Sequence, residues 1–114
     1  NLTAANPIQW ARLKRAKARG ARVVVIDPFR TPSADLADLW IRPRPGTDAA
    51  IALAMIDVMI KERLYDEAFV RAWCHGFDAL RERAAKYPPD RAASIAQVNA
   101  EDVVAAARHF ASGA

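Results

Sequence analysis

Asp27 stands where a carboxylate could bind the sugar of a nucleotide. It directly follows the apolar run of residues 23–26, which is typical of a buried strand. In open parallel sheets, ligands bind beyond the carboxyl ends of the strands, and one carboxylate there can accept hydrogen bonds from both ribose hydroxyls. Asp before Pro is also a common turn pair, so a structural role for Asp27 is an equal alternative.

Arg30 and Thr31 follow in the same loop. The planar guanidinium of Arg30 carries a fork of donors that suits a phosphate group. The alternative is a surface ion pair of Arg30 with Asp35 or Asp38, and residue types alone favour that ion pair. A phosphate contact for Arg30 therefore needs support from other segments that also indicate a nucleotide.

Gly46, Thr47 and Asp48 stand at the start of an apolar helix. Helix N-termini favour anions and offer free backbone N–H groups. A carboxylate can also accept hydrogen bonds from the ring N–H and the 2-amino group of guanine together, whereas adenine lacks both donors at these positions. The simpler alternative is an N-cap by Thr47 or Asp48, which these residues alone favour.

Catalytic and metal-binding motifs are absent from the sequence. No G-x-G-x-x-G, G-x-x-x-x-G-K-[ST] or G-x-S-x-G occurs, which excludes a complete dinucleotide fold, a P-loop and a nucleophile elbow. Cys74, His75 and His109 are the only Cys and His residues, too few for a metal site of these types. Cys74 and His75 are adjacent, so on a helix they point apart. We predict no catalytic residue and no metal ligand.

The net charge of +4 is concentrated in one predicted helix and its end. A basic helix can bind nucleic acid, so a small basic α/β nucleic-acid-binding module is the alternative function; a purely structural domain without a ligand is another. No aromatic residues are interleaved with the charges, and we predict a solvated helix face and no nucleic-acid partner. The cations are Arg12, Lys14, Arg15, Lys17, Arg19 and Arg22.

Composition and hydropathy indicate a globular chain. The sequence is 53% hydrophobic and 26% charged, which is ordinary for a folded domain of this length. The longest apolar stretch, residues 49–60, is interrupted by Asp57 and is too short to span a bilayer. We therefore expect no membrane insertion, and the cellular compartment stays open.

The first half of the chain has the pattern of a nucleotide-binding sheet. Pro7, with Asn6 as N-cap, begins a helix that Gly20 ends. Residues 22–27 then form a strand that should be buried on both faces, as in a parallel sheet covered by helices on both sides. A β-α-β unit needs a strand before its helix, and we expect that strand to precede Asn1.

The second half reads as helical. Ser33 is predicted to cap a short helical turn, residues 39–41 a second strand, and the helix from residue 48 to about Leu64 should be central and buried, with a pair between Asp57 and Lys61. Further helices are expected over residues 66–73 and 77–87 and from Asn99 onward, with a turn over 90–96 and an apolar stripe of Val103, Val104, Ala107, Phe110 and Ala111.

These elements predict an α/β fold: a partial, doubly wound (Rossmann-like) parallel sheet with a helical C-terminal half. We expect residues 1–114 to be a single partial cofactor-binding domain of a larger enzyme. Within it, residues 1–64 would be the βα nucleotide-binding part and residues 65–114 a helical extension.

The order of the segments resembles the nucleotide-binding domain of the dimethyl sulfoxide reductase family of molybdopterin oxidoreductases, which are molybdenum and tungsten enzymes. The resemblance covers nearly the whole chain, and it is specific through the order and spacing of its motifs rather than through any one of them. It is carried by Asn1, Asn6-Pro7, residues 20–31, Ala37-Asp38-Leu39, residues 44–48, residues 64–70, Gly76-Phe77 and Tyr87-Pro88.

The resemblance implies a role for each candidate residue. Asn1 would approach the phosphates of the cofactor and Asp27 would bind the guanosine ribose. Pro28, Arg30 and Thr31 would shape and charge the same pocket, and guanine would be bound by Gly46 and Asp48, with Thr47 between them. The chain departs from the family at Phe29, where a second Arg is frequent, which lowers the charge offered to the pyrophosphate.

The resemblance also implies the cofactors and partners. Two molybdopterin guanine dinucleotides would hold molybdenum or tungsten for a two-electron oxidation or reduction, often an oxygen-atom transfer. The metal ligand, an iron–sulfur cluster and the substrate funnel would lie in the remaining domains of a parent enzyme, with an upstream Cys cluster and several hundred residues beyond Ala114. An electron-transfer subunit is the expected partner. Trp73-Cys74 before Gly76-Phe77 is similar to the acetylene hydratase and thiosulfate reductase branch.

Overall fold

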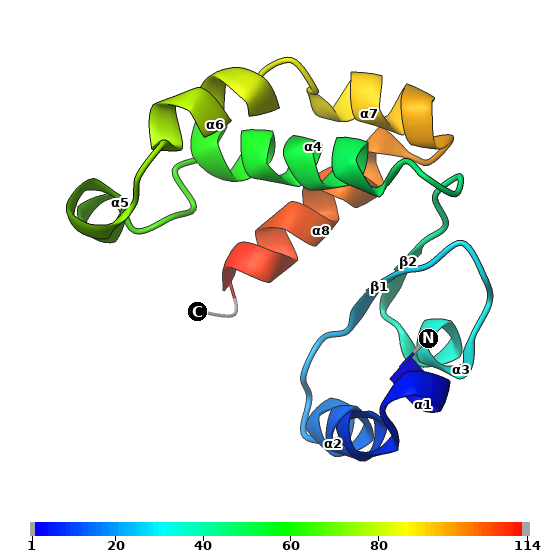
Figure 1. The fold of residues 1–114 in the computed structure, drawn as a ribbon. Coiled ribbons are helices and arrows are strands. Elements are labelled where there is room, and N and C mark those ends of the chain that lie inside the picture. Colours follow the sequence, from blue (N-terminus) through cyan, green and yellow to red (C-terminus); the bar gives the residue numbers. More distant parts are fainter. Residues whose placement is uncertain (1, 113–114) are drawn as a thin grey trace. The chain divides into compact units, whose positions relative to one another are not determined.

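The computed structural model describes residues 2–112, which form two compact units that divide between Pro43 and Arg44 (Figure 1). The N-terminal unit contains α1 (Leu2–Ala5), α2 (Pro7–Ala18), β1 (Val24–Ile26), α3 (Pro32–Leu36) and β2 (Leu39–Ile41). The C-terminal unit contains α4 (Asp48–Lys61), α5 (Glu67–Trp73), α6 (Phe77–Ala84), α7 (Pro89–Ala96) and α8 (Ala100–Ser112).

The two strands confirm the predicted α/β class and parallel pairing. β1 and β2 run parallel, with Val24 opposite Leu39 and Ile26 opposite Ile41. The expectation that the first strand is buried on both faces is wrong, because Val23 just before β1 is buried while Ile26 remains 39% exposed. In the described part of the chain the sheet has two strands, and so narrow a sheet offers little surface on which helices could cover both faces.

Helix α2 begins and ends as the sequence predicts. The Asn6 side chain accepts a hydrogen bond from the backbone N–H of Gln9 at 3.1 Å, and Pro7 occupies the first helical position. Gly20 follows the helix with a φ of +94°, a conformation that favours glycine. Trp10 on this helix is half-buried and lies under the Lys14 ammonium group at 5.5 Å.

Asp38 joins α2 to the residue that precedes β1. One carboxylate oxygen accepts a hydrogen bond from the backbone N–H of Val23 at 2.7 Å, and the other forms an ion pair with Lys17. The backbone N–H of Asp38 in turn donates to the Val23 carbonyl at 2.8 Å. The hydrogen bond from Lys17, followed by that from Val23, holds the pKa of the Asp38 carboxyl below its usual range.

This lowered pKa predicts an acid-sensitive entry to β1. Because the folded pKa lies below the unfolded value of about 3.9, the Asp38 contribution to stability is complete above that value and is lost as the pH falls through the folded pKa. We expect amide exchange at residues 23–26, corrected for its intrinsic pH dependence, to rise in this window. Asp38→Asn, whose amide oxygen can still accept the Val23 N–H bond but has no charge for Lys17 and does not titrate, should show no such rise as the pH falls. Glu62→Gln, which removes a carboxyl from the C-terminal unit, is the matched control.

Helix α3 starts earlier than predicted. Thr31, not Ser33, is its N-cap, because the Thr31 hydroxyl accepts a hydrogen bond from the backbone N–H of Ala34 at 3.4 Å. Pro32 takes the first helical position, for which its fixed φ is suited. Ser33 therefore lies inside the helix, where its hydroxyl is buried and has no hydrogen-bond partner among the described residues.

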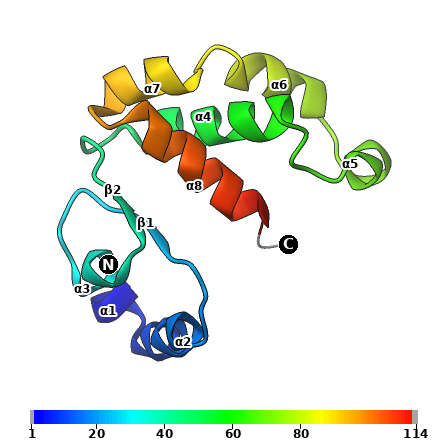
Figure 2. The ribbon, with the colours of Figure 1, turned by 180° about the vertical axis from the view of Figure 1, so that it is seen from behind.

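Helix α4 is the centre of the C-terminal unit, as the sequence predicts. It packs against α6, α7 and α8, and Figures 1 and 2 show these helices around it from opposite sides. Ile51 and Ala54 are fully buried on α4. The helices around it contribute mostly small residues, which let the backbones approach closely; the buried ones are Ala84, Ala92, Ala93, Ala96, Val103, Ala106 and Ala107.

The remaining helix boundaries are set by caps and by proline. The Asp66 side chain accepts a hydrogen bond from the backbone N–H of Phe69 at 2.8 Å, and Gly76 (φ +77°) precedes α6. Asn99 accepts a hydrogen bond from the backbone N–H of Glu101 at 3.2 Å. Residues 90–96, predicted as a turn, belong to helix α7, because Pro89 begins a helix here.

The predicted apolar stripe of α8 is only partly correct. Val103 and Ala107 are buried, whereas Phe110 is 74% exposed.

No helix within residues 2–112 combines the length and apolar character that crossing a membrane requires.

Candidate cofactor-binding site

Asp27 anchors the loop at the carboxyl end of β1. Its backbone N–H donates to the Ile41 carbonyl at 3.1 Å, and its carbonyl accepts a hydrogen bond from the Trp40 indole N–H at 2.9 Å. Its carboxylate accepts one from the backbone N–H of Phe29 at 2.8 Å. The turn role that the sequence left as an alternative is therefore present, and it places the half-buried carboxylate at the end of a parallel strand.

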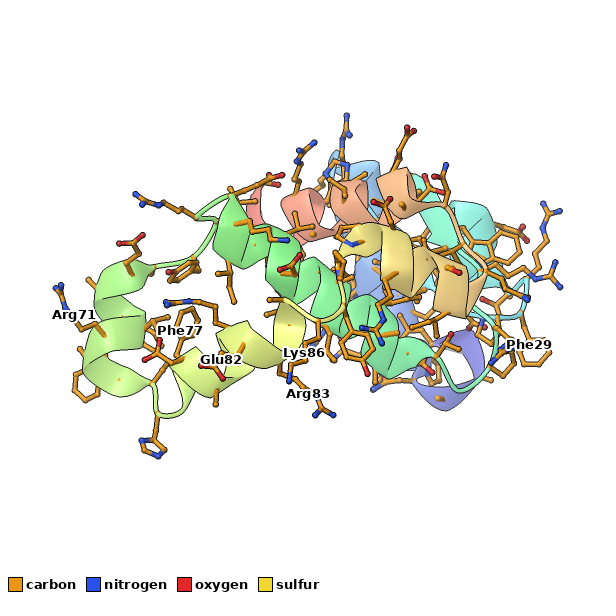
Figure 3. The ribbon with its side chains drawn as sticks, turned by 90° about the horizontal axis from the view of Figure 1, so that it is seen from above. Phe29, Arg71, Phe77, Glu82, Arg83 and Lys86 are labelled. Carbon is orange, nitrogen blue, oxygen red and sulfur yellow. The ribbon has the colours of Figure 1, made fainter. Side chains whose placement is uncertain are left out.

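Pro28 and Phe29 form the turn itself. The Pro28 carbonyl accepts a hydrogen bond from the Arg42 guanidinium Nε at 3.1 Å, which ties this turn to the residue after β2. Phe29 is 70% exposed, and Figure 3 shows its side chain on the outside of the fold. The backbone of the turn is thus held by hydrogen bonds, while its Phe29 ring is exposed.

Arg30 forms the ion pair that residue types favoured. Its Nε lies 2.7 Å from a carboxylate oxygen of Asp35, and this hydrogen bond raises the pKa of Arg30. Both side chains are exposed, at 75% and 55%, so the pair is open to water. The terminal guanidinium nitrogens have no hydrogen-bond partner within the part of the chain that the structure describes, and they can still donate to an anion.

Thr31 serves the structure of the loop. Its side chain is buried and caps α3. The hydroxyl therefore fixes the start of α3 directly after Arg30.

Gly46 and Thr47 form a tight turn before α4. The backbone N–H of Thr47 donates to the Arg44 carbonyl at 3.3 Å, and its hydroxyl donates to the same oxygen at 2.6 Å. Gly46 has a φ of +82°, in the region that favours glycine. Thr47 is the N-cap residue by position, but its hydroxyl accepts no hydrogen bond from the helix, so no side chain caps α4.

Asp48 is the first residue of α4 and is exposed. Its carboxylate has no partner among residues 2–112. A free carboxylate thus stands beside uncapped backbone N–H groups, an arrangement that offers acceptors and donors side by side. Helices α2, α3 and α5 instead begin with side-chain caps.

The predicted site residues are distributed over both units. Asp27, Pro28, Arg30 and Thr31 are brought together in the loop after β1, and residues 46–48 are brought together before α4. Asn1 lies outside the described residues. Across residues 2–112, no group of three or more His, Cys, Asp or Glu side chains could hold a metal ion.

Sequence reasoning missed two supporting residues, Trp40 and Arg42. Both donate to backbone carbonyls of the Asp27 turn. Trp40 lies in β2 and Arg42 directly follows it, so the pairing of β2 with β1 brings both to this turn. The signal that could have identified them is this register, in which Trp40 and Arg42 flank the residue opposite Ile26.

A separate hollow of about 740 Å³ lies in the C-terminal unit between the end of α4, α5 and α6. Its walls include Tyr65 and Phe77, whose ring centroids are 5.1 Å apart, and Arg81 lies over the Phe77 ring at 5.1 Å. Figure 3 shows Phe77 between α5 and α6, with Arg71 on the outer side of α5. None of the predicted site residues lines this hollow.

Comparisons with known proteins identify relatives over most of the chain. The molybdopterin oxidoreductase family model matches residues 1–111. Acetylene hydratase from Syntrophotalea acetylenica is 48% identical over 90% of this chain and 14% of its own length. The F420-dependent formate dehydrogenase subunit alpha from Methanocaldococcus jannaschii is 39% identical over 92% of this chain and 16% of its own.

A solved structure has the same fold. The acetylene hydratase from Pelobacter acetylenicus superimposes with a TM-score of 0.86 at 47% identity, over 90% of this chain and 14% of that one. The chain therefore spans only about 14% of the length of these acetylene hydratases.

Proposed function

Because the chain belongs to the molybdopterin oxidoreductase family, we propose that it binds the guanosine end of a molybdopterin guanine dinucleotide. The family implies molybdenum or tungsten on a pterin cofactor, and that group supplies the redox chemistry when bound. The residues of this chain would bind and orient the cofactor by its nucleotide.

Asp48 is the observation that carries this proposal. A carboxylate without a partner, exposed at the uncapped start of α4, can accept two parallel hydrogen bonds from the ring N–H and 2-amino group of guanine. The exposed Gly46 turn leaves open space, since no heavy atom beyond Gly46 and its two chain neighbours lies within 4 Å of where a Gly46 Cβ would be. Thr47 holds that turn through its bond to Arg44.

The loop after β1 supports a second contact, with sugar and phosphate. Asp27 presents a carboxylate at a strand end, where it could accept hydrogen bonds from ribose hydroxyls. Arg30 has terminal donors for a phosphate, and Pro28 and Thr31 fix the loop from which it extends. Asn1 keeps the phosphate role that the family resemblance implies.

The chemistry of the whole protein lies beyond these residues. We propose a two-electron redox reaction or oxygen-atom transfer at molybdenum or tungsten held by two such dinucleotides, with an iron–sulfur cluster and an electron-transfer partner. Relatives named for formate dehydrogenation, thiosulfate reduction and acetylene hydration all match this segment. Because enzymes with such different substrates share this segment, a role in binding the common cofactor explains it better than a role in substrate specificity.

Asp27→Asn in the full-length enzyme should reduce bound cofactor. The amide oxygen can still accept the Phe29 N–H bond, so the turn is kept while the charge that favours ribose hydroxyls is lost. We expect about a tenfold loss of affinity, because hydrogen bonds to charged groups contribute about 1.5–3 kcal/mol. The measurement is the ratio of acid-released GMP, and of molybdenum or tungsten, to polypeptide.

Asp66→Asn is the matched control for this variant. Asp66 also accepts a backbone N–H bond through its carboxylate at 2.8 Å, but it caps α5 in the C-terminal unit. Equal cofactor content in the Asp27 and Asp66 variants would contradict the ribose assignment.

A further inference from the structure

We infer that Phe29 is a further cofactor-binding residue, whose ring stacks on the base of the bound nucleotide. The inference rests on the proposed function, because it places Phe29 beside the ribose contact of Asp27. It adds an aromatic contact to a loop whose polar residues alone would bind sugar and phosphate.

The Phe29 side chain is 70% exposed and projects from the outside of the N-terminal unit (Figure 3). Exposed single apolar residues are common on protein surfaces, so exposure alone does not indicate a binding role. The position of the ring and the hydrogen bonds of its loop must also favour one.

The loop around Phe29 is fixed by bonds on both sides. The Phe29 backbone N–H donates to the Asp27 carboxylate at 2.8 Å, and the preceding carbonyl of Pro28 accepts a hydrogen bond from Arg42. The following residue, Arg30, is bonded to Asp35. A ring presented by a bonded loop loses little conformational freedom when a ligand arrives.

The loop that contains Phe29 begins at the carboxyl end of a parallel strand, where open sheets bind ligands. Within four consecutive residues the loop offers a carboxylate, a ring and a guanidinium from Asp27, Phe29 and Arg30. These groups suit ribose, base and phosphate respectively, and a π face stacks on a base without needing its hydrogen-bonding edge.

The test compares Phe29→Ser with Phe110→Ser in the full-length enzyme. Phe110 is a matched control, since it is 74% exposed and lies on α8 in the C-terminal unit. We expect Phe29→Ser to raise the rate of cofactor release about tenfold, as expected for the loss of one stacked base, while Phe110→Ser leaves it unchanged. Phe29→Trp, which keeps a π face, should retain the cofactor. The readout is GMP per polypeptide during dialysis.

Several results would overturn the inference. One is release from Phe29→Ser no faster than from Phe110→Ser while Asp27→Asn loses cofactor; that result would leave the proposed function intact. If neither Phe29→Ser nor Asp27→Asn changes GMP content, the ribose contact fails as well. A melting temperature of the cofactor-free enzyme that falls with Phe29→Ser but not with Phe110→Ser would indicate a packing contact instead.

Discussion

Replacing Asp48 by Asn in the full-length enzyme is expected to lower its affinity for the guanine dinucleotide by about 10- to 100-fold. Asparagine keeps one acceptor oxygen and puts an amide N–H₂ group where the second oxygen stood, opposite the 2-amino group of guanine. Hydrogen bonds to a charged partner contribute about 1.5–3 kcal/mol, and each 1.4 kcal/mol is about tenfold in affinity. Reconstitution of cofactor-free enzyme, followed by GMP content per polypeptide, measures the change.

Glu67→Gln separates this effect from a general effect of charge at a helix start. Glu67 is the first residue of α5, as Asp48 is of α4, so both variants remove a carboxylate that the helix dipole favours by about 0.3–1 kcal/mol. The proposal requires loss of GMP from the Asp48 variant alone. If both variants retain the same GMP content, Asp48 only stabilises the start of its helix.

Local signals in the sequence predicted most helix boundaries correctly. Asn6, Asp66 and Asn99 cap the helices that they were expected to cap, and Gly20 and Gly76 adopt the positive φ values of chain reversals. These features depend on a few adjacent residues, so a single sequence contains the necessary information.

Features that depend on neighbours distant in sequence were predicted less well. The cap of α3 was mispredicted for a local reason instead: Ser33 and Thr31 are both competent N-caps, and Pro32 at the first helical position favours Thr31. The burial of β1 depends on how many strands and helices surround it, and the apolar run of residues 23–26 contains no information on that number. Phe110 continues the apolar spacing of α8 but is 74% exposed, although Ala111 next to it is half-buried.

The candidate site shows the same limit. Residue types identified Asp27, Arg30 and Asp48 as binding candidates, and the structure assigns Arg30 a partner, Asp35, that the sequence offered only as one of two. The supporting hydrogen bonds come from Trp40 in the paired strand β2 and from Arg42 directly after it. Strand register, rather than local sequence, determines those bonds.

Helix α4 contains an ion pair with one buried end. Sequence spacing predicted the pair between Asp57 and Lys61, and the structure confirms it at 2.7 Å. It did not predict that the Asp57 side chain is only 4% exposed while that of Lys61 is 61% exposed. The pair therefore places one charge inside the C-terminal unit and the other at its surface.

Lys61→Met should destabilise α4 by about 3 kcal/mol, because it leaves the buried Asp57 carboxylate without its partner. Hydrogen exchange of α4 amides in the full-length enzyme should then become about 100-fold faster. Arg81→Met is the control, since its pair with Asp78 is exposed at both ends, and surface pairs contribute about 0–1 kcal/mol.

The double variant Asp57→Leu with Lys61→Met tests the cause. If the penalty of Lys61→Met comes from the buried carboxylate, then replacing that carboxylate by an apolar side chain of similar size should restore slow exchange, because apolar packing can match or exceed a buried ion pair. Exchange in the double variant that stays as fast as in Lys61→Met would assign the loss to the Lys61 side chain itself. Recovery would show that α4 is held by the apolar packing of its neighbours, and that the ion pair only neutralises a charge that this packing encloses.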